Sequence, residues 1–521
     1  MLDVLIKNTT IIDGSMEGKE YRADLGINSG RISAIGALSE RASRTIDGTG
    51  LVTSPGFIDV QNHSDSYGAL LSSPSLESLL YQGITSAIVG HCGSSLAPLL
   101  SGSLASIQKW STIEGVNVNW RSVAEFLETV GRSGLGTNLG TFVGHATIRR
   151  EFASDASRAL SEREIQQVTR LLERSFREGG WGLSIGLEYA HEREVAEEEL
   201  IHFLKTTHKE KRLCSLHLRD EGPDFFSALS EVLFLLRSTD VRTKISHIKI
   251  ENETDPARGE HALETITSAR AQGHALYLDI YPYTVSAGVL YLFLPSWATE
   301  GGRDALLSKL RNDTLRTEIA AEMRDHGLPY ERITIASGLE RTLIGKSIAE
   351  LARNQGRDPE DIIMDLLIAT NDQIIVFFEN IDEAVMETFL KDPYTMVATD
   401  GSGHLQTDQK RGALVHPRSF GSTARLLGRY VRERKTLSLP EAIYKLTGLP
   451  AAYLGLVNRG AIRIGNAADL VLFDRDRIAD MATFKNPFEY PKGIEHVLVN
   501  GRVAISNGRY TGETAGTILR P

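Results

Sequence analysis

Potential metal ligands and proton carriers recur near the ends of short apolar runs in this sequence. Cys92 follows the run in TSAIVGHCG, His217 lies in CSLHLRDEG, and His247 lies in TKISHIKIE. A thiolate and two imidazoles suit a catalytic zinc, which usually keeps three protein ligands and one open position. The run YTMVATDGSG ends in Asp400, whose carboxylate could take a proton from a bound water and pass it to a leaving group. A fifth run, PGFIDVQNHSD, carries His63.

Residues of these types also have ordinary structural roles. A lone cysteine is commonly a small buried hydrophobic residue, a lone strand histidine is commonly hydrogen-bonded structure, and an Asp before Gly is commonly a turn residue. Cys92 lies in a glycine-flanked loop, which favours the ligand role, whereas Cys214 lies inside its run and is expected in the core. His91, His145 and His416 are weaker candidates, and His145 could support a ligand from behind.

The apolar runs have the length of buried strands, and catalytic side chains in parallel-sheet folds lie at strand ends. Between residues 55 and 454 such runs alternate with segments of helical periodicity, among them 122–132, 161–180 and 196–211. This alternation predicts a parallel sheet covered by helices. Because the chemically active residues come from many strands, a closed (β/α)8 barrel is favoured over an open sheet.

The two ends of the chain have a different pattern. Residues 1–54 and 455–521 contain short runs of alternating polarity with turn signals such as Asn500-Gly501, so we expect them to pair into one discontinuous small domain. Residues 286–335 interrupt the alternation of strands and helices. We expect a helical insertion there, which could cover the substrate.

Composition and charge restrict the class of protein. With 521 residues, 41% of them hydrophobic and 24% charged, the chain is globular and long enough for a large domain and a smaller one. Its net charge of -10 argues against a nucleic-acid partner. Two cysteines and the absence of a signal-peptide pattern predict a cytoplasmic protein, and no apolar run reaches the roughly 20 residues of a membrane span. The composition is compatible with a homo-oligomer as well as with a monomer.

The motifs also carry a family resemblance. In order, they are PGFIDVQNHSD, GHCGSSLAP, FVGHATIR, HLRDEG, ISHIK, YPYT, LPSWATEGG, TDGSG, HPRSFGSTARLLGRYVRE and RGAIRIGNAADLVLFD. Together they resemble the N-acyl-D-amino-acid deacylase (D-aminoacylase) family of the amidohydrolase superfamily over nearly the whole chain. The resemblance implies a (β/α)8 TIM barrel with a small β-sandwich from both termini. It also implies zinc-dependent hydrolysis of the amide bond of a small-molecule substrate, an N-acyl-D-amino acid.

The resemblance assigns roles to individual residues. Cys92, His217 and His247 match the tight zinc ligands, and Asp400 matches the catalytic acid/base.

Further positions match or lie near residues that contact substrate in the family. These are Lys249, Tyr283 and Arg411, with Tyr281 as an alternative to Tyr283. Arg411 is expected to bind the substrate carboxylate, because a guanidinium binds a carboxylate bidentately. Arg219 and Arg418 are expected to be structural or to support the site.

The sequence departs from the family pattern after the first strand. The family has His-x-His there, whereas this chain has Gln61-Asn62-His63. Only His63 remains for a weaker second metal position, and a neutral Gln61 is a poor zinc ligand. We therefore expect one tightly bound zinc, and His63 could instead hydrogen-bond the developing oxyanion.

Alternatives stay open at this point. The same scaffold could hydrolyse a cyclic amide or a D-aminoacyl peptide, or it could be a non-catalytic relative, since a fold alone does not establish function. The ligand types do not separate zinc from iron or cobalt. The preferred D-side chain and acyl group are not predicted.

Overall fold

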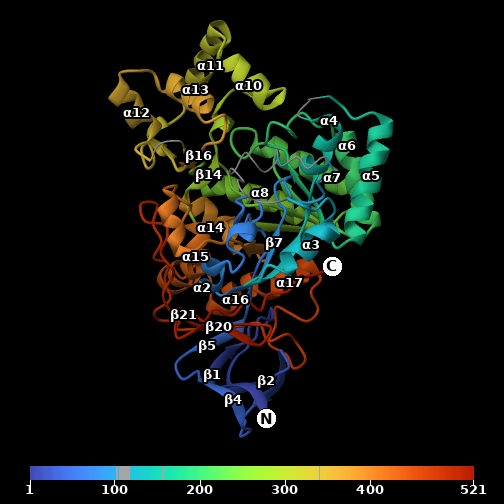
Figure 1. Ribbon diagram of the computed structural model, residues 1–521, viewed down its shortest axis with the longest axis vertical. Helices are drawn as coiled ribbons and strands as arrows, with labels where there is room; N and C mark the ends of the chain where they lie inside the picture. The colour runs from blue at the N-terminus through green and yellow to red at the C-terminus, as the bar shows by residue number, and fades with distance from the viewer. Residues whose placement is uncertain (101–103, 105–117, 155–157, 339–340) are drawn as a thin grey trace.

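The computed structural model describes residues 1–100, 104, 118–154, 158–338 and 341–521 (Figure 1). Its centre consists of two parallel sheets. The first has the order β17-β13-β12-β11-β10-β9, with bounds Thr395–Val397, Leu276–Ile280, Thr243–Ile245, Leu213–His217, Gly182–Gly186 and Val143–Gly144. The second has the order β6-β7-β8, with bounds Phe57–Asp59, Ile84–Val89 and Asn138–Thr141. Strands β7, β10 and β11 are buried along their whole length, as expected for strands covered on both faces.

The two parallel sheets touch at both of their edges. The segment 138–144 contributes β8 to one sheet and β9 to the other. On the far side, Asn62 and Gly401 form a parallel bridge, and the amide of Asp400 donates to the Gln61 carbonyl at 2.9 Å. The carboxyl ends of β6 and β17 therefore adjoin. The strands pair as two separate sheets that touch at their edges. The closure of these sheets into a single barrel stays a prediction.

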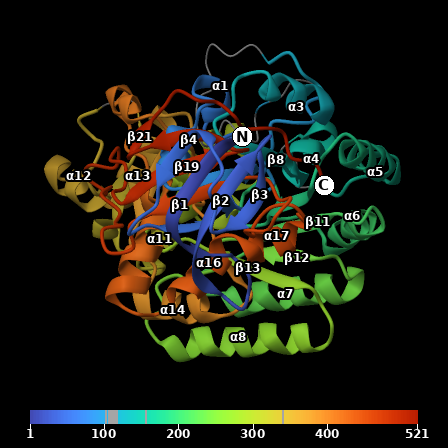
Figure 2. The ribbon, with the colours of Figure 1, turned by 90° about the horizontal axis from the view of Figure 1, so that it is seen from below.

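Helices lie around the outside of these strands, as Figure 2 shows for α5 to α8. The three predicted helical segments correspond to α3 (Val123–Gly131), α5 (Glu162–Arg177) and α6 (Glu197–Lys209). The helices α3 and α5 each begin at a serine that forms a capping box with a glutamate three residues later, which satisfies otherwise unpaired amides. In the described part of the chain, no helix is long and apolar enough to cross a bilayer.

The remaining helices around the strands have the following bounds. They are α1 Ala69–Ser72, α2 Glu77–Tyr81, α4 His145–Ala153, α7 Phe225–Thr239, α8 Pro256–Ala271, α14 Glu383–Lys391, η3 Gln406–Arg411, α15 Arg418–Arg425, η4 Leu426–Glu433, α16 Leu439–Leu446 and α17 Gly448–Leu454. The element η4 is a π-helix that continues α15.

Strands from both ends of the chain pair in one further sheet, at the bottom of Figure 1. The N-terminal strands are β1 Leu2–Ile12, β2 Glu20–Asn28, β3 Arg31–Gly36, β4 Ala42–Asp47 and β5 Val52–Pro55. The C-terminal strands are β18 Leu470–Phe473, β19 Ile494–Val499, β20 Arg502–Ser506 and β21 Arg509–Tyr510. The antiparallel pair β5 and β18 joins the two groups. Domain boundaries at 54 and 455 stay a prediction.

The predicted helical insertion at 286–335 is part of a longer segment that contains strands. It begins with β14 (Ser286–Val289) and continues through η1 Leu290–Phe293, α9 Ser296–Thr299, α10 Gly302–Leu310, α11 Asp313–Asp325, η2 Tyr330–Arg332, β15 Ile333–Ile335, α12 Ile348–Gln355, α13 Pro359–Ala369 and β16 Ile375–Phe378. Both β14 and β15 pair antiparallel with β16, which lies beyond the predicted range. Such short strands are defined by a distant partner, which explains why the local pattern missed them. The segment has a buried apolar cluster largely of its own.

Candidate metal centre and active site

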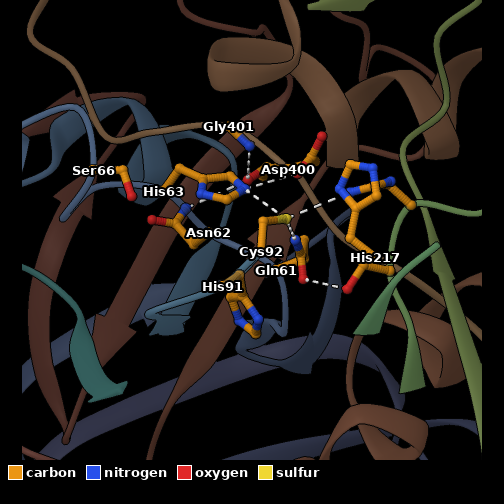
Figure 3. Close-up of polar contacts among 12 residues, drawn as sticks. Gln61, Asn62, His63, Ser66, His91, Cys92, His217, Asp400 and Gly401 are labelled. Carbon is orange, nitrogen blue, oxygen red and sulfur yellow. Dashed lines mark hydrogen bonds and ion pairs between the residues drawn. The ribbon is translucent and has the colours of Figure 1, made fainter. Parts of the chain in front are cut away.

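Cys92, His217 and His247 converge at the carboxyl ends of the parallel strands. Cys92 follows β7, His217 ends β11, and His247 follows β12. One potential ligand atom from each lies within 4.8 Å of the other two, and all three residues are buried. The Cys92 Sγ atom is 3.5 Å from His247 Nε2. Figure 3 shows this sulfur at the centre of the contacts, with His91 turned to the other side.

The backbone turns sharply at several of these positions. Cys92, His247 and Asp400 have φ values of 54°, 36° and 48°. A positive φ is uncommon for residues other than glycine and persists only where the surrounding structure enforces it. Such strained positions cluster at active sites, and here each of the three carries a chemically active side chain.

The local chemistry of this cluster fits a metal ion. The Nδ1 atom of His217 is buried and has no hydrogen-bond partner among the described residues. Burial opposes charge on Cys92, but the neighbouring His217, His247 and His63 side chains hold the pKa of its thiol well below the usual value. A thiolate is the form of cysteine that binds metals, and one sulfur with two imidazoles is a zinc-type ligand set.

Two glutamates orient the histidine ligands from behind. His217 Nε2 lies 2.8 Å from Glu188, and His247 Nδ1 lies 3.1 Å from Glu221. Glu188, His217 and Glu221 also form a close group of potential ligand atoms. Carboxylates that accept a hydrogen bond from a ligating histidine fix its ring orientation and increase its basicity. We interpret both glutamates in this way.

Asp400 lies beside the same cluster between two cationic side chains. His63 Nε2 contacts Asp400 Oδ1 at 3.0 Å, and Arg418 contacts Oδ2 at 2.7 Å. Burial opposes ionisation of Asp400, but Arg418, His247 and His63 hold its pKa well below the usual value. Burial also opposes charge on His63, but Asp400 and Cys92 raise its pKa to about 10. Asp400 is thus a carboxylate near neutral pH and can accept a proton.

A cavity of about 910 Å³ opens above these residues. Lys249, Tyr281 and Arg418 line it, together with residues of the 286–378 segment. Lys249 forms an ion pair with Glu221, and the Arg418 guanidinium lies 4.6 Å from the centre of the Tyr281 ring. The cavity therefore combines the candidate metal centre with two buried cationic side chains, each paired with a carboxylate.

The structure does not bring two of the expected substrate-binding residues to this cavity. Among the described residues, those that line it include neither Tyr283 nor Arg411. The Tyr283 hydroxyl is 3.4 Å from the Pro417 carbonyl, so this side chain packs behind the site. Arg411 has a side chain that is 64% exposed and pairs with Asp408 at 3.4 Å. Arg411 borders a neighbouring cavity of about 340 Å³.

Arg418 and Tyr281 lie in the large cavity, whereas Arg411 and Tyr283 are absent from its lining among the described residues. Arg418 is only 4% exposed. Arg418 begins α15, which directs it back toward Asp400. The resemblance placed Arg418 in a structural or supporting role, and the structure shows it in the cavity lining, paired with Asp400. Arg219 remains outside and pairs with Glu231 at 2.6 Å.

The weaker candidates have structural partners. His91 and His416 each contact a backbone carbonyl, at 3.1 and 2.9 Å. His145 Nδ1 lies 2.6 Å from Glu192, and Cys214 is buried within β11.

Sequence reasoning missed Glu188 and Glu221. Glu221 lies in a loop four residues after His217. That closeness in sequence is a signal that could have identified it as a partner of the ligands.

Comparisons with known proteins show the family to which the chain belongs. The model of the amidohydrolase family matches residues 44–505. A D-aminoacylase of Alcaligenes xylosoxydans xylosoxydans is 32% identical over 99% of this chain and 97% of its own length. An N-acyl-D-glutamate deacylase of the same organism is 33% identical over 96% of this chain and 93% of its own length.

Solved structures of similar proteins cover the whole chain. The N-acyl-D-glutamate deacylase of Bordetella bronchiseptica, solved with zinc and a phosphonate inhibitor, has a TM-score of 0.83, 30% identity and full coverage of both chains. A D-aminoacylase studied for its binuclear metal centre has a TM-score of 0.84 and 29% identity, again with full coverage of both chains. The chain therefore belongs to the amidohydrolase family.

Proposed function

We propose that this chain is a zinc-dependent hydrolase that cleaves the amide bond of N-acyl-D-amino acids to a carboxylate and a free D-amino acid. The observation that carries the proposal is the convergence of Cys92, His217 and His247 next to Asp400 in one cavity. The full-length similarity to D-aminoacylase and to N-acyl-D-glutamate deacylase supports the substrate class. The substrate is thus a small molecule with an acyl group and a carboxylate.

We also infer that the two parallel sheets form one (β/α)8 barrel, and that residues 1–54 and 455–521 form a small β-sandwich domain. The shared segment 138–144 and the bridge between Asn62 and Gly401 support closure of the barrel. The sheet formed by strands of both termini supports the small domain.

Cys92, His217 and His247 would hold one zinc ion. When bound, such an ion polarises the scissile carbonyl and lowers the pKa of water. Asp400 accepts the proton of the attacking water on a carboxylate oxygen and then donates it to the leaving nitrogen. The Arg418 and His63 contacts keep this carboxylate ionised before the reaction. His63 lines the same cavity, and we assign it as the donor of a hydrogen bond to the developing oxyanion.

We assign recognition of the substrate carboxylate to Arg418, Lys249 and Tyr281. The Nε atom of Arg418 is buried and has no hydrogen-bond partner among the described residues, while another nitrogen binds Asp400. A guanidinium has five N–H donors, so it can bind Asp400 and a substrate carboxylate together. Lys249 adds a second cation to the cavity lining, and its ion pair with Glu221 fixes its position.

Two measurements test the proposal. Elemental analysis of the purified protein should give one zinc per chain, and N-acetyl-D-amino acids should be hydrolysed while their L enantiomers are not. Cyclic imides should not be substrates. Inactivity on both linear enantiomers together with turnover of a cyclic amide would refute the assigned substrate class, and the absence of bound metal after zinc-replete purification would refute the metal centre.

A further inference from the structure

Gln61 links a buried lysine to the candidate sulfur ligand. Its Oε1 atom lies 2.6 Å from Lys244 Nζ and 3.2 Å from Ser246 Oγ, and its Nε2 atom lies 3.3 Å from Cys92 Sγ. Gln61 and Lys244 are both fully buried. Figure 3 shows the Gln61 side chain directly against Cys92.

The chemistry of these groups fixes the orientation of the Gln61 amide. An ammonium group has donors only, so the atom of Gln61 that faces Lys244 must be the oxygen. The NH2 group therefore faces Cys92 and donates to its sulfur. Lys244 and Ser246 both donate hydrogen bonds to the oxygen, so both of its lone pairs are engaged. The amide therefore has no free lone pair with which to bind a metal ion.

Lys244 is itself held by the groups around the centre. Its ammonium forms an ion pair with Asp279, and Asp279 accepts a hydrogen bond from the backbone amide of His247 at 2.8 Å. The carboxylate of Asp279 balances the charge of Lys244, so Lys244 acts here by hydrogen bonding: it holds the Gln61 oxygen and leaves no room for a metal ion at that atom. Gln61 lies between Lys244 and Cys92 and links the buried ion pair to the ligand sulfur.

We propose that Gln61 and Lys244 together take the place of a second metal ion, with Gln61 donating an N–H···S hydrogen bond to the ligand sulfur of Cys92. The centre then stays mononuclear when metal is in excess. Gln61 acts as a positioning residue for Cys92, and His63 serves Asp400 rather than a second cation. The inference rests on the proposed zinc centre.

The first test uses the wild-type protein. Equilibrium dialysis against about tenfold excess zinc, followed by elemental analysis, should give one zinc per chain. Two zinc ions per chain would overturn the inference and leave the proposed function intact. No bound zinc would overturn the zinc centre and the inference together, so the two failures are distinguishable.

The second test uses variants under the same dialysis. Gln61→His alone should still bind one zinc, because Lys244 remains. Adding the paired changes Lys244→Met and Asp279→Asn removes both partners of the buried ion pair, so no buried charge is left unpaired. This triple variant should bind two zinc ions, whereas the Lys244→Met/Asp279→Asn control should bind one. A second zinc in the Gln61→His variant alone would contradict the role of Lys244.

The third test reads the N–H···S hydrogen bond directly in the cobalt-substituted protein. Gln61→Met keeps the length of the side chain but removes the donor. A hydrogen bond stabilises the sulfur lone pairs, so its loss should move the sulfur-to-cobalt charge-transfer band to longer wavelength, with the cobalt content unchanged. An unshifted band would overturn the assigned hydrogen bond.

Discussion

The structure predicts opposite outcomes for substitutions of Arg418 and Arg411: the first should weaken recognition of the substrate carboxylate, and the second should not. Arg418 is buried in the large cavity and contacts Asp400 at 2.7 Å, whereas Arg411 has a 64% exposed side chain outside it. Replacing each arginine by lysine keeps the charge but removes the planar fork that binds a carboxylate through two parallel hydrogen bonds. The pair therefore tests which guanidinium binds the substrate carboxylate, with the second variant as a matched control.

The expected size of the effect follows from the lost contact. A hydrogen bond to a charged group contributes about 2 kcal/mol, and about 1.4 kcal/mol corresponds to a tenfold change. The variant Arg418→Lys should therefore lower kcat/KM for an N-acetyl-D-amino acid by roughly 30-fold. Arg411→Lys should change it by less than about twofold, because exposed ion pairs contribute little.

The assay must separate substrate binding from the effect on Asp400, which Arg418 also contacts. Each variant is measured with the N-acetyl-D-amino acid and with its carboxamide, which lacks the carboxylate. Loss of the Arg418 fork should affect the acid substantially more than the carboxamide. An equal loss on both substrates would show that Arg418 acts only through Asp400, and a large loss in Arg411→Lys would refute the assignment.

Three further predictions follow from the same geometry. The variant Asp400→Asn should lower kcat by about a thousandfold with unchanged zinc content, because general acid-base catalysis contributes roughly 10² to 10⁴; an active variant would remove its assigned role. Burial opposes charge on His217 and His247, but neighbouring carboxylates raise the pKa of both, so zinc must displace protons. Competition titrations should therefore show tighter zinc binding as pH rises, and a pH-independent affinity would contradict this. Burial also opposes charge on His145, but Glu192 and Glu199 raise its pKa from 6.5 to about 9. The protonated His145 therefore stabilises the fold fully below pH 6.5, and this stabilisation is lost as the pH rises toward 9. In urea unfolding, the difference in unfolding free energy between wild type and His145→Gln should be about 3 kcal/mol larger at about pH 6 than at about pH 10. A difference that does not change with pH would refute this prediction.

The convergence of the three ligands could be predicted from the sequence because it depends on local patterns. Apolar runs mark the buried strands, and the carboxyl ends of parallel strands meet at one face. Cys92, His217 and His247 come just at or after the ends of such runs, so their positions along the chain already implied their proximity.

The choice between Arg411 and Arg418 could not be made from the sequence. Both follow Asp400 in the same connection, seven residues apart, and both have the chemistry to bind a carboxylate. What separates them is the three-dimensional path of that connection: Arg411 ends η3 at the surface, whereas Arg418 begins α15 in the interior. Likewise, the contact of Gln61 with Lys244 joins residues that are 183 positions apart, and no local pattern encodes it.

The 286–378 segment contributes many of the residues that line the cavity but none of the proposed metal ligands. Its apolar interior is largely separate from the cluster that packs between the parallel strands and their helices. Mutations in this segment can therefore reshape the substrate side of the cavity while the strand ends that carry the chemistry stay in place. Such a division allows relatives with the same reaction centre to diverge in the side chains they accept, and it marks the segment as the place to exchange when a new specificity is wanted.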